Sequence, residues 1–203
     1  MKVRPLAVTG SWEFTPVVHG DQRGAFVSPL LGDEFTDAVG HRLTVAQTNF
    51  NRSAKGVLRG IHFTSVPPGQ AKYVCCSRGR AIDAVIDLRV GSPTFGVWDS
   101  VELDPDTWRS VYLPVGVGHA FLALEDDTIM SYLVSTGYVA EREQTLDAMD
   151  AELGLPWPRD MAFVRSERDV AAVGLLEARR RGLLPGYEAC LAAEREAQAG
   201  GAR

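Results

Sequence analysis

Short apolar runs follow one another through the middle of the chain and are separated by polar turn residues. They are Leu43–Phe50, Val57–Phe63, Ala71–Cys76, Ala81–Leu88, Val97–Leu103, Ser110–Leu113, Ala120–Leu124 and Thr128–Val134. Gly, Pro, Asp or Ser marks most of the breaks, and many short strands with this punctuation are typical of a β-sandwich or barrel. No long helical pattern lies between the runs, which argues against a parallel α/β sheet. The pattern therefore predicts an all-β fold.

Helical patterns lie outside this β-rich stretch. Before it, Asp33–Val39 predicts a short helix. After it, Ser166–Gly182 carries spaced apolar residues and ends in consecutive arginines, which favour a helix C-terminus. A further helix is expected from Tyr187 to Ala197. Because no repeat or linker divides the chain, residues 1–203 are expected to form one domain, with a β core over residues 43–135 and a helical segment over residues 166–197.

Composition and charge narrow the function classes. The chain has 203 residues and a formal net charge of −5, so no overall field attracts nucleic acid or an anionic membrane. No apolar run approaches the roughly 20 residues that span a bilayer, and the N-terminus lacks the apolar core of a signal peptide. The three cysteines provide no disulfide framework and are expected to be reduced thiols. These features predict a cytoplasmic protein without nucleic-acid or membrane partners.

The strongest chemical signal is Gly56–Phe63, which places Arg59 and His62 at the end of an apolar run. A second imidazole, His119, follows a glycine-rich turn, with Lys72 between the two histidines and Tyr132 after them. A base, an ammonium, a phenol and arginines on a β scaffold suit an enzyme that moves a proton beside a carbonyl of a phosphorylated substrate. The alternative for His62 is a hydrogen-bonded core histidine.

Lys72 and Tyr132 each have a structural and a chemical interpretation. Lys72 enters an apolar strand, and if it does not face solvent its buried charge needs an anion such as an enolate oxygen. Tyr132 is either ordinary strand packing or a phenol that returns a proton from the face opposite the base. Epimerisation requires that second face, because one base acting on one face restores the original centre.

The remaining candidates concern strand geometry, anion binding and metals. Arg59 and His62 differ in strand parity, so both reach one pocket only if Gly60 carries a bulge or an irregular strand end. Arg23, Arg59 and Arg168 would together suit a phosphate clamp, although singly each is an ordinary surface charge. The histidines are isolated from one another, so no metal site is expected.

Taken together, the motifs from about Asp21 to Asp169 resemble the dTDP-4-dehydrorhamnose 3,5-epimerase family, whose fold is a cupin-type jelly-roll barrel, here with short peripheral and C-terminal helices. Each motif is weak, but their order and spacing are specific. The matching pieces are Asp21–Phe26, Gln47-Thr48-Asn49, Lys55–Phe63, Ala71-Lys72, Gly91–Gly96 and Gly116–Phe121.

The resemblance implies a role for each matching residue. It makes His62 the proton acceptor, Asp169 its partner, Tyr132 the proton donor and Lys72 the residue beside the C4 oxygen of the sugar; alone, Asp169 would be an ordinary acid in the first turn of a helix. It implies substrate contacts for Arg23, Gln47, Thr48, Asn49, Arg59, Lys72, His119, Tyr138, Glu143 and Arg168. It also implies a homodimer in which Arg23 reaches the neighbouring site, and no metal or organic cofactor.

Two positions depart from the family pattern: Ser28 stands where many members carry Glu, and Thr64 replaces a frequent Gln. The runs around Lys72 and His119 look most like the branch that serves antibiotic deoxysugar pathways. The expected function is epimerisation of a dTDP-4-keto-6-deoxyhexose at C3, C5 or both. The alternatives are a sugar-nucleotide 3,4-ketoisomerase and a non-catalytic sugar-nucleotide binding barrel.

Overall fold

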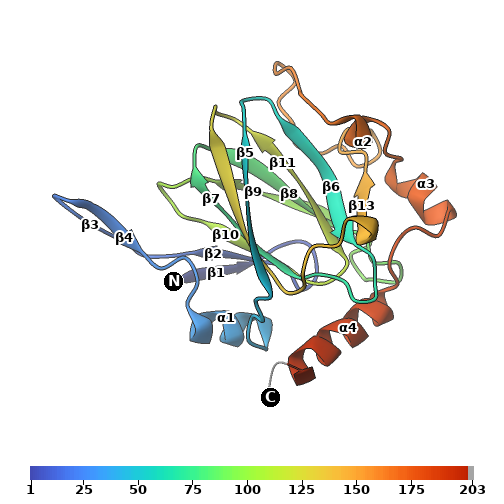
Figure 1. Ribbon diagram of the computed structural model, residues 1–203, viewed down its shortest axis with the longest axis horizontal. Coiled ribbons are helices and arrows are strands. Elements are labelled where there is room, and N and C mark those ends of the chain that lie inside the picture. The colour runs from blue at the N-terminus through green and yellow to red at the C-terminus, as the bar shows by residue number, and fades with distance from the viewer. Residues whose placement is uncertain (201–203) are drawn as a thin grey trace.

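The computed structural model describes residues 1–200 and is built on two antiparallel sheets (Figure 1). The order across the six-stranded sheet is β1 (Lys2–Pro5), β2 (Trp12–Thr15), β10 (Ser110–Leu113), β7 (Lys72–Arg78), β12 (Thr128–Val134) and β5 (Gln47–Ser53). The order across the five-stranded sheet is β13 (Glu143–Leu146), β6 (Leu58–Thr64), β11 (Val117–Ala123), β8 (Ala81–Asp87) and β9 (Trp98–Leu103). The predicted all-β fold is confirmed.

One apolar core lies between the two sheets. Val74 and Met130 of the six-stranded sheet pack with Val85 and Phe121 of the five-stranded sheet. The strands β8 and β11 are buried on both faces, which explains their nearly continuous apolar sequence.

Strand prediction was accurate inside the barrel and failed at its margins. Ser110–Leu113 and Thr128–Val134 coincide with β10 and β12, whereas β5 begins at Gln47 rather than Leu43. The sequence pattern did not show β1, β2 or β13, which extend both sheets beyond residues 43–135. The four residues of β1 are all exposed, so they carry no alternation of apolar and polar positions that a pattern search would recognise.

The first predicted helix is present and the long one after the barrel is not. Helix α1 (Gly32–Val39) ends at Gly40, whose φ of 90° terminates it in the left-handed conformation. The helix expected over Ser166–Gly182 was wrong, because the chain forms two short helices, α2 (Glu167–Val170) and α3 (Leu175–Arg180).

Contacts with residues 147–150 explain that break between α2 and α3. The backbone N–H of Asp147 donates to the carbonyl of Val173 (3.0 Å), and the N–H of Leu175 donates to the Asp150 carboxylate (2.8 Å). Residues 171–174 therefore satisfy their backbone partly outside any helix. Beyond them lies α4 (Tyr187–Gly200), and a short 3₁₀ turn, η1 (Ala140–Arg142), precedes β13. No helix within residues 1–200 is long and apolar enough to cross a membrane.

The C-terminal segment covers the outer face of the five-stranded sheet. Leu58, Ile86 and Leu122 of that sheet pack against Leu175, with Trp157 at the edge of the cluster. Figure 1 shows α2 and α3 beside β6 and β13, while α1 and α4 lie at the opposite end of the molecule from α2. This packing brings residues that follow the barrel in sequence next to β6.

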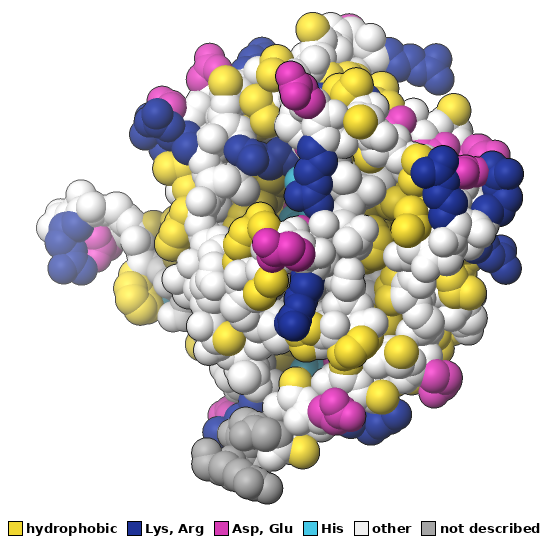
Figure 2. Space-filling view, turned by 45° about the vertical axis from the view of Figure 1, so that its right-hand side comes forward, with side chains coloured by type: hydrophobic (Ala, Val, Ile, Leu, Met, Phe, Trp, Pro, Cys, Tyr) yellow, Lys and Arg dark blue, Asp and Glu magenta, His cyan; other side chains and the backbone are white. Residues whose placement is uncertain are grey.

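A separate two-stranded arm projects from the body. It consists of β3 (Val18–Asp21) and β4 (Gly24–Val27) and pairs with neither large sheet. The arm stands clear of the rest of the molecule (Figure 1), and Figure 2 shows charged side chains near its end. Phe26 on this arm is 70% exposed, which is unusual for a large apolar side chain within a single isolated chain.

Candidate active site

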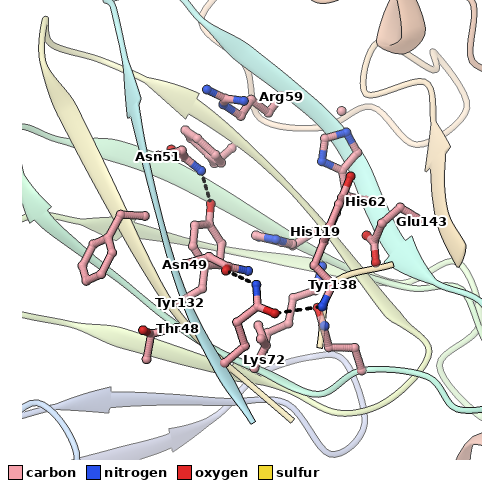
Figure 3. Close-up of a pocket in the computed structure, with 16 residues that line it drawn as sticks. Thr48, Asn49, Asn51, Arg59, His62, Lys72, His119, Tyr132, Tyr138 and Glu143 are labelled. Carbon is pink, nitrogen blue, oxygen red and sulfur yellow. Dashed lines mark hydrogen bonds between the residues drawn. The ribbon is translucent and has the colours of Figure 1, made fainter. Parts of the chain in front are cut away.

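A cavity of about 500 Å³ opens between the two sheets, and polar side chains from both sheets line it (Figure 3). The strand β5 contributes Gln47, Asn49 and Asn51, because its half-buried and exposed residues alternate with the two-residue period of a strand. The other lining residues are Thr48, Phe50, Arg59, Gly60, His62, Gln70, Lys72, His119, Phe121, Tyr132, Val134, Tyr138 and Glu143. The cavity therefore gathers nearly all of the predicted site residues.

His62 and Asp169 form a hydrogen-bonded pair across 107 positions of sequence, with 2.8 Å between Nε2 and Oδ1. Asp169 also accepts hydrogen bonds from the hydroxyls of Ser166 (2.8 Å) and Thr145 (3.0 Å). Burial disfavours the charged carboxylate, but these hydrogen bonds outweigh burial and hold the pKa of Asp169 well below its ordinary value. When His62 is neutral, the ionised Asp169 accepts the Nε2 proton and the lone pair is on Nδ1.

Gly60 permits this pair to form. A Cβ at position 60 would lie 2.7 Å from Oδ1 of Asp169, closer than real Cβ contacts. The predicted irregularity of β6 is also present. His62 pairs with His119 and Arg59 pairs with Phe121, so the chain advances three residues along β6 while it advances two along β11, as in a β-bulge. Arg59 and His62 consequently both face the cavity despite their opposite strand parity.

Lys72 lies at the base of the cavity with only 6% of its surface exposed. Burial lowers its pKa from the ordinary value, and the carboxylates of Glu143 and Asp83 oppose that effect. Within residues 1–200, no carboxylate lies within ion-pair distance of its ammonium. A buried ammonium with this environment is arranged to receive an anionic group from a ligand.

Tyr132 and His62 come from different sheets and lie on either side of the cavity (Figure 3). The phenol oxygen of Tyr132 accepts a hydrogen bond from Asn51 Nδ2 (3.0 Å). Burial raises the pKa of Tyr132, and the nearby charge of Asp83 raises it further. Between them, His119 packs edge-on to the Tyr132 ring at 5.8 Å and bonds through Nδ1 to Asp83 (3.0 Å).

Polar residues at the mouth of the cavity hold one another in place. Gln47 donates to Asn49 Oδ1 (2.6 Å) and accepts from the backbone N–H of Tyr138 (3.0 Å). Glu143 accepts from the Thr64 hydroxyl (2.7 Å), which stands where the family pattern often has Gln. These groups present fixed donors and acceptors to a ligand.

Three predicted contact residues lie at or beyond the margin. Thr48 borders the mouth of the cavity but projects from the exposed face of β5, away from Lys72 (Figure 3). Arg168 lines an adjoining hollow of about 340 Å³ that it shares with Arg59 and His62, and Figure 2 shows a little histidine surface in a recess flanked by cationic side chains. Arg23 is on the projecting arm, outside the cavity of its own chain.

Sequence reasoning missed Asn51, Asp83 and Thr145 as parts of the site. Asn51 continues the two-residue period of Gln47 and Asn49, so strand parity was a usable signal for it. Asp83 is one of two carboxylates in the otherwise apolar run of β8. Thr145 became relevant only through the pairing of β13 with β6, which has no local sequence signal. Within residues 1–200, no three His, Cys, Asp or Glu side chains form a group able to hold a metal ion.

Replacing Asp169 by Asn is expected to lower the melting temperature at neutral pH, and this difference should narrow in acid. A carboxylate whose folded-state pKa is depressed stabilises the fold fully above its ordinary pKa, and that stability is lost as the pH falls through the folded-state pKa. Because the folded-state pKa of Asp169 lies well below the ordinary value, the melting temperatures of the two proteins should begin to approach each other only below about pH 4 and should continue to do so down to about pH 2. Asp160→Asn, at an exposed position, is the control; a gap that is as wide at about pH 3 as at about pH 7 would contradict the assignment.

Comparisons with known proteins match most of the chain to one family. A family model described as dTDP-4-dehydrorhamnose 3,5-epimerase matches residues 5–177. The dTDP-4-dehydrorhamnose 3,5-epimerase of Mycolicibacterium smegmatis is 47% identical over 192 residues, which cover 95% of this chain and 94% of the relative. The match thus extends through both sheets and into α3.

Two solved structures agree with this chain in fold as well as in sequence. ChmJ, a 3'-monoepimerase from Streptomyces bikiniensis in complex with dTDP-quinovose, gives a TM-score of 0.89 at 46% identity, covering 96% of this chain and 98% of ChmJ. NovW, a 4-keto-6-deoxy sugar epimerase from the novobiocin biosynthetic gene cluster of Streptomyces spheroides, gives a TM-score of 0.90 at 47% identity, covering 94% and 95% of the two chains. The chain therefore belongs to the dTDP-4-dehydrorhamnose 3,5-epimerase family of isomerases, with relatives in its antibiotic deoxysugar branch.

Proposed function

We propose that this enzyme inverts C3, C5 or both in a dTDP-4-keto-6-deoxyhexose, in the biosynthesis of a deoxysugar for an antibiotic. Family membership supports the reaction class. The observation that carries the proposal is the placement of His62, with its ionised partner Asp169, and of Tyr132 on different sheets around one cavity, with the Lys72 ammonium between them in the cavity base. A base and an acid on opposite faces are what inversion of a carbon centre requires.

His62 acts as the base in this proposal. Its Nδ1 lone pair takes the proton from the carbon next to the C4 ketone. The electron pair of that C–H bond forms the new C=C bond, and the π pair of the ketone moves to the C4 oxygen. Asp169 stabilises the imidazolium that results, because it is already ionised and hydrogen-bonded to the other ring nitrogen.

Lys72 stabilises the enolate that this step creates. Its ammonium is buried without an ion-pair partner in the described residues, so the charge developing on the C4 oxygen meets a cation that is fixed before the reaction begins. Because burial lowers its pKa, Lys72 gains more from an anionic neighbour than an exposed lysine would.

Tyr132 returns the proton on the other face. Its raised pKa keeps the phenol protonated at neutral pH, so it can donate the O–H proton to the planar carbon and receive a proton from solvent afterwards. Asn51 donates to the phenol oxygen and thereby orients the O–H away from itself. The base gains one proton and the acid loses one, so the substrate is isomerised without net loss of atoms.

The nucleotide diphosphate occupies the polar mouth of the cavity. Arg59 and Arg168 border neighbouring hollows beside His62 and supply cations for the diphosphate. The fixed amides of Gln47 and Asn49, the Tyr138 ring and the Glu143 carboxylate contact the nucleoside and sugar. Thr48 contributes at the rim, and His119 contacts the sugar from the cavity wall.

A second copy of the chain completes the site. The Arg23 side chain is 85% exposed, forms an ion pair within residues 1–200 with Asp21 alone, on the same arm, and lies outside the cavity of its own chain. Phe26 on the arm and Phe50 on the outer face of β5 are 70% and 71% exposed, which favours burial of these surfaces against a partner. The family resemblance implies a homodimer, in which the arm carries Arg23 to the neighbouring cavity.

Mixed dimers test where Arg23 acts. Arg23→Ala and His62→Asn homodimers should each be impaired, whereas a heterodimer of the two should regain activity at one site, because one chain supplies His62 and the other supplies Arg23. Loss of the charged contact should raise KM roughly 10–100-fold in the Arg23→Ala homodimer. Activity of tagged, co-purified heterodimers is the measurement, and failure to regain activity would place Arg23 outside the neighbouring site.

Deuterium exchange tests the proposed function itself. In deuterated water, NMR should show deuterium entering C3, C5 or both of dTDP-4-keto-6-deoxyglucose, with inversion at the labelled carbon. Migration of the carbonyl to C3 would identify a 3,4-ketoisomerase instead. Binding without exchange, across a panel of dTDP-4-keto sugars, would identify a binding barrel.

The three thiols support the proposal that the enzyme works in the cytoplasm. Cys76 and Cys190 are buried, Cys75 is half-buried, and all three are free. Free thiols persist in a reducing compartment.

A further inference from the structure

Asp83 is a buried carboxylate that the proposed proton transfers leave without a role. It is 0% exposed and lies on β8 between Ala81 and Val85, two residues of the core between the sheets. Its Oδ2 bonds to His119, while Oδ1 is buried and has no hydrogen-bond partner within residues 1–200. Such a group is costly to keep in an apolar core, which points to a functional reason for it.

The pair of Asp83 with His119 fixes the state of that imidazole. Burial lowers the pKa of His119 and outweighs the opposing effect of Asp83, so the neutral ring is favoured. A neutral ring that bonds to a carboxylate through Nδ1 must carry its single proton there. Its other nitrogen, Nε2, then has a lone pair, and the ring lines the cavity between His62 and Tyr132 (Figure 3).

We propose that Asp83 is a positioning residue that holds the His119 proton on Nδ1, so that Nε2 accepts a hydrogen bond from a hydroxyl group of the hexose. This inference rests on the proposed function, which supplies the sugar. An acceptor nitrogen is unsuited to a phosphate or an enolate oxygen, because both require a donor. Stabilisation of the enolate is therefore left to Lys72, and His119 orients the ring of the sugar.

Asp87 provides a matched control on the same strand. It is also 0% exposed, but its carboxylate is satisfied by Arg89, Ser92 and Thr94 and does not line the cavity. Asp87→Asn should therefore lower stability and leave the kinetic constants of the folded enzyme unchanged. Asp83→Asn removes a carboxylate of equal burial whose partner lines the cavity.

The protonation of His119 can be measured without any substrate. The chain has four histidines, so ¹⁵N NMR of the ring nitrogens is tractable, with His119→Gln to assign the signals. We expect His119 in the wild-type enzyme to be neutral with its proton on Nδ1 from about pH 7 to pH 8. In Asp83→Asn the new amide can either accept a hydrogen bond from His119 Nδ1 or donate one to it. The tautomer of His119 that carries its proton on Nε2 should therefore appear in this variant. A wild-type ring that is protonated, or that carries its proton on Nε2, would overturn the proposal.

Kinetics then test whether Asp83 acts through His119. Asp83→Asn should raise KM about 10–100-fold with a smaller change in kcat, because the hydroxyl bond exists in both ground and transition states. Combining Asp83→Asn with His119→Ala should cost no more than His119→Ala alone, and the cost should disappear for the 2-deoxy or the 3-deoxy analogue that lacks the contacted hydroxyl. Additive effects, or a variant that behaves like Asp87→Asn, would refute the role. If no keto sugar is turned over, the proposed function fails while the NMR result still stands.

Discussion

Replacing His62 by Asn is expected to lower kcat by about 10²–10⁴-fold and to stop deuterium entry at C3 and C5, because Asn has no lone pair basic enough to take a carbon-bound proton. Asp169 keeps its hydrogen bonds from the Ser166 and Thr145 hydroxyls in this variant, so the ionised carboxylate is not left unpaired. The loss of activity should therefore result from slower proton transfer and not from unfolding of the variant. The measurement is NMR of the substrate in deuterated water together with initial rates.

A control for this variant is the same substitution at His41, which lies outside the cavity and contacts the rings of Phe35 and Tyr112. His41→Asn should leave kcat unchanged. The affinity of His62→Asn for dTDP, measured by calorimetry, should match the wild type, because the nucleotide contacts lie at the mouth. Exchange that continues at the wild-type rate in His62→Asn would remove His62 from the reaction and with it the proposed mechanism.

Replacing Tyr132 by Phe is expected to separate two events that coincide in the wild-type enzyme. The substitution leaves His62 unchanged, so His62 still removes a proton and returns a deuteron to the same face of the substrate carbon. Deuterium exchange with retention of configuration should therefore continue. Inversion should fall by about 10²–10⁴-fold, because the opposite face has lost its general acid. The measurement is the ratio of deuterium uptake to inverted product, followed by NMR in a single reaction.

Tyr73 supplies the matched control for the loss of a phenol. Its hydroxyl donates to the carbonyl of Pro29 (2.6 Å) in a different apolar cluster, and its ring is 2% exposed. Tyr73→Phe should lower stability and leave the ratio of exchange to inversion unchanged. If Tyr132→Phe still inverts at the wild-type rate, another group or a water molecule protonates that face, and Tyr132 is only a wall of the cavity.

The sequence pattern predicted the strands where burial imposes a clear period. Thr128–Val134 coincides with β12, and the expected break in β6 at Gly60 follows from strand parity alone. The exposed β1 carries no such period, and the C-terminal helix was overestimated because contacts with Asp147 and Asp150 divide it.

Long-range partners in the site were beyond any local signal. Asp169 was assigned from the family resemblance, and the 2.8 Å contact with His62 depends on how the C-terminal segment packs against the five-stranded sheet. Asp83 was missed because an acid within an apolar strand is equally consistent with a strand edge or with a buried pair. Only the antiparallel pairing of β8 with β11 in one sheet brings it to His119.

The absence of a side chain at Gly60 has a consequence for how this enzyme tolerates substitution. Position 60 offers no group that ionises, donates or accepts through a side chain, yet a single added methyl would clash with the Asp169 carboxylate. A screen for inactive variants should therefore recover substitutions at Gly60, although glycine has no side chain that could take part in the reaction. The geometry of the His62–Asp169 pair depends on the absence of a Cβ atom at position 60.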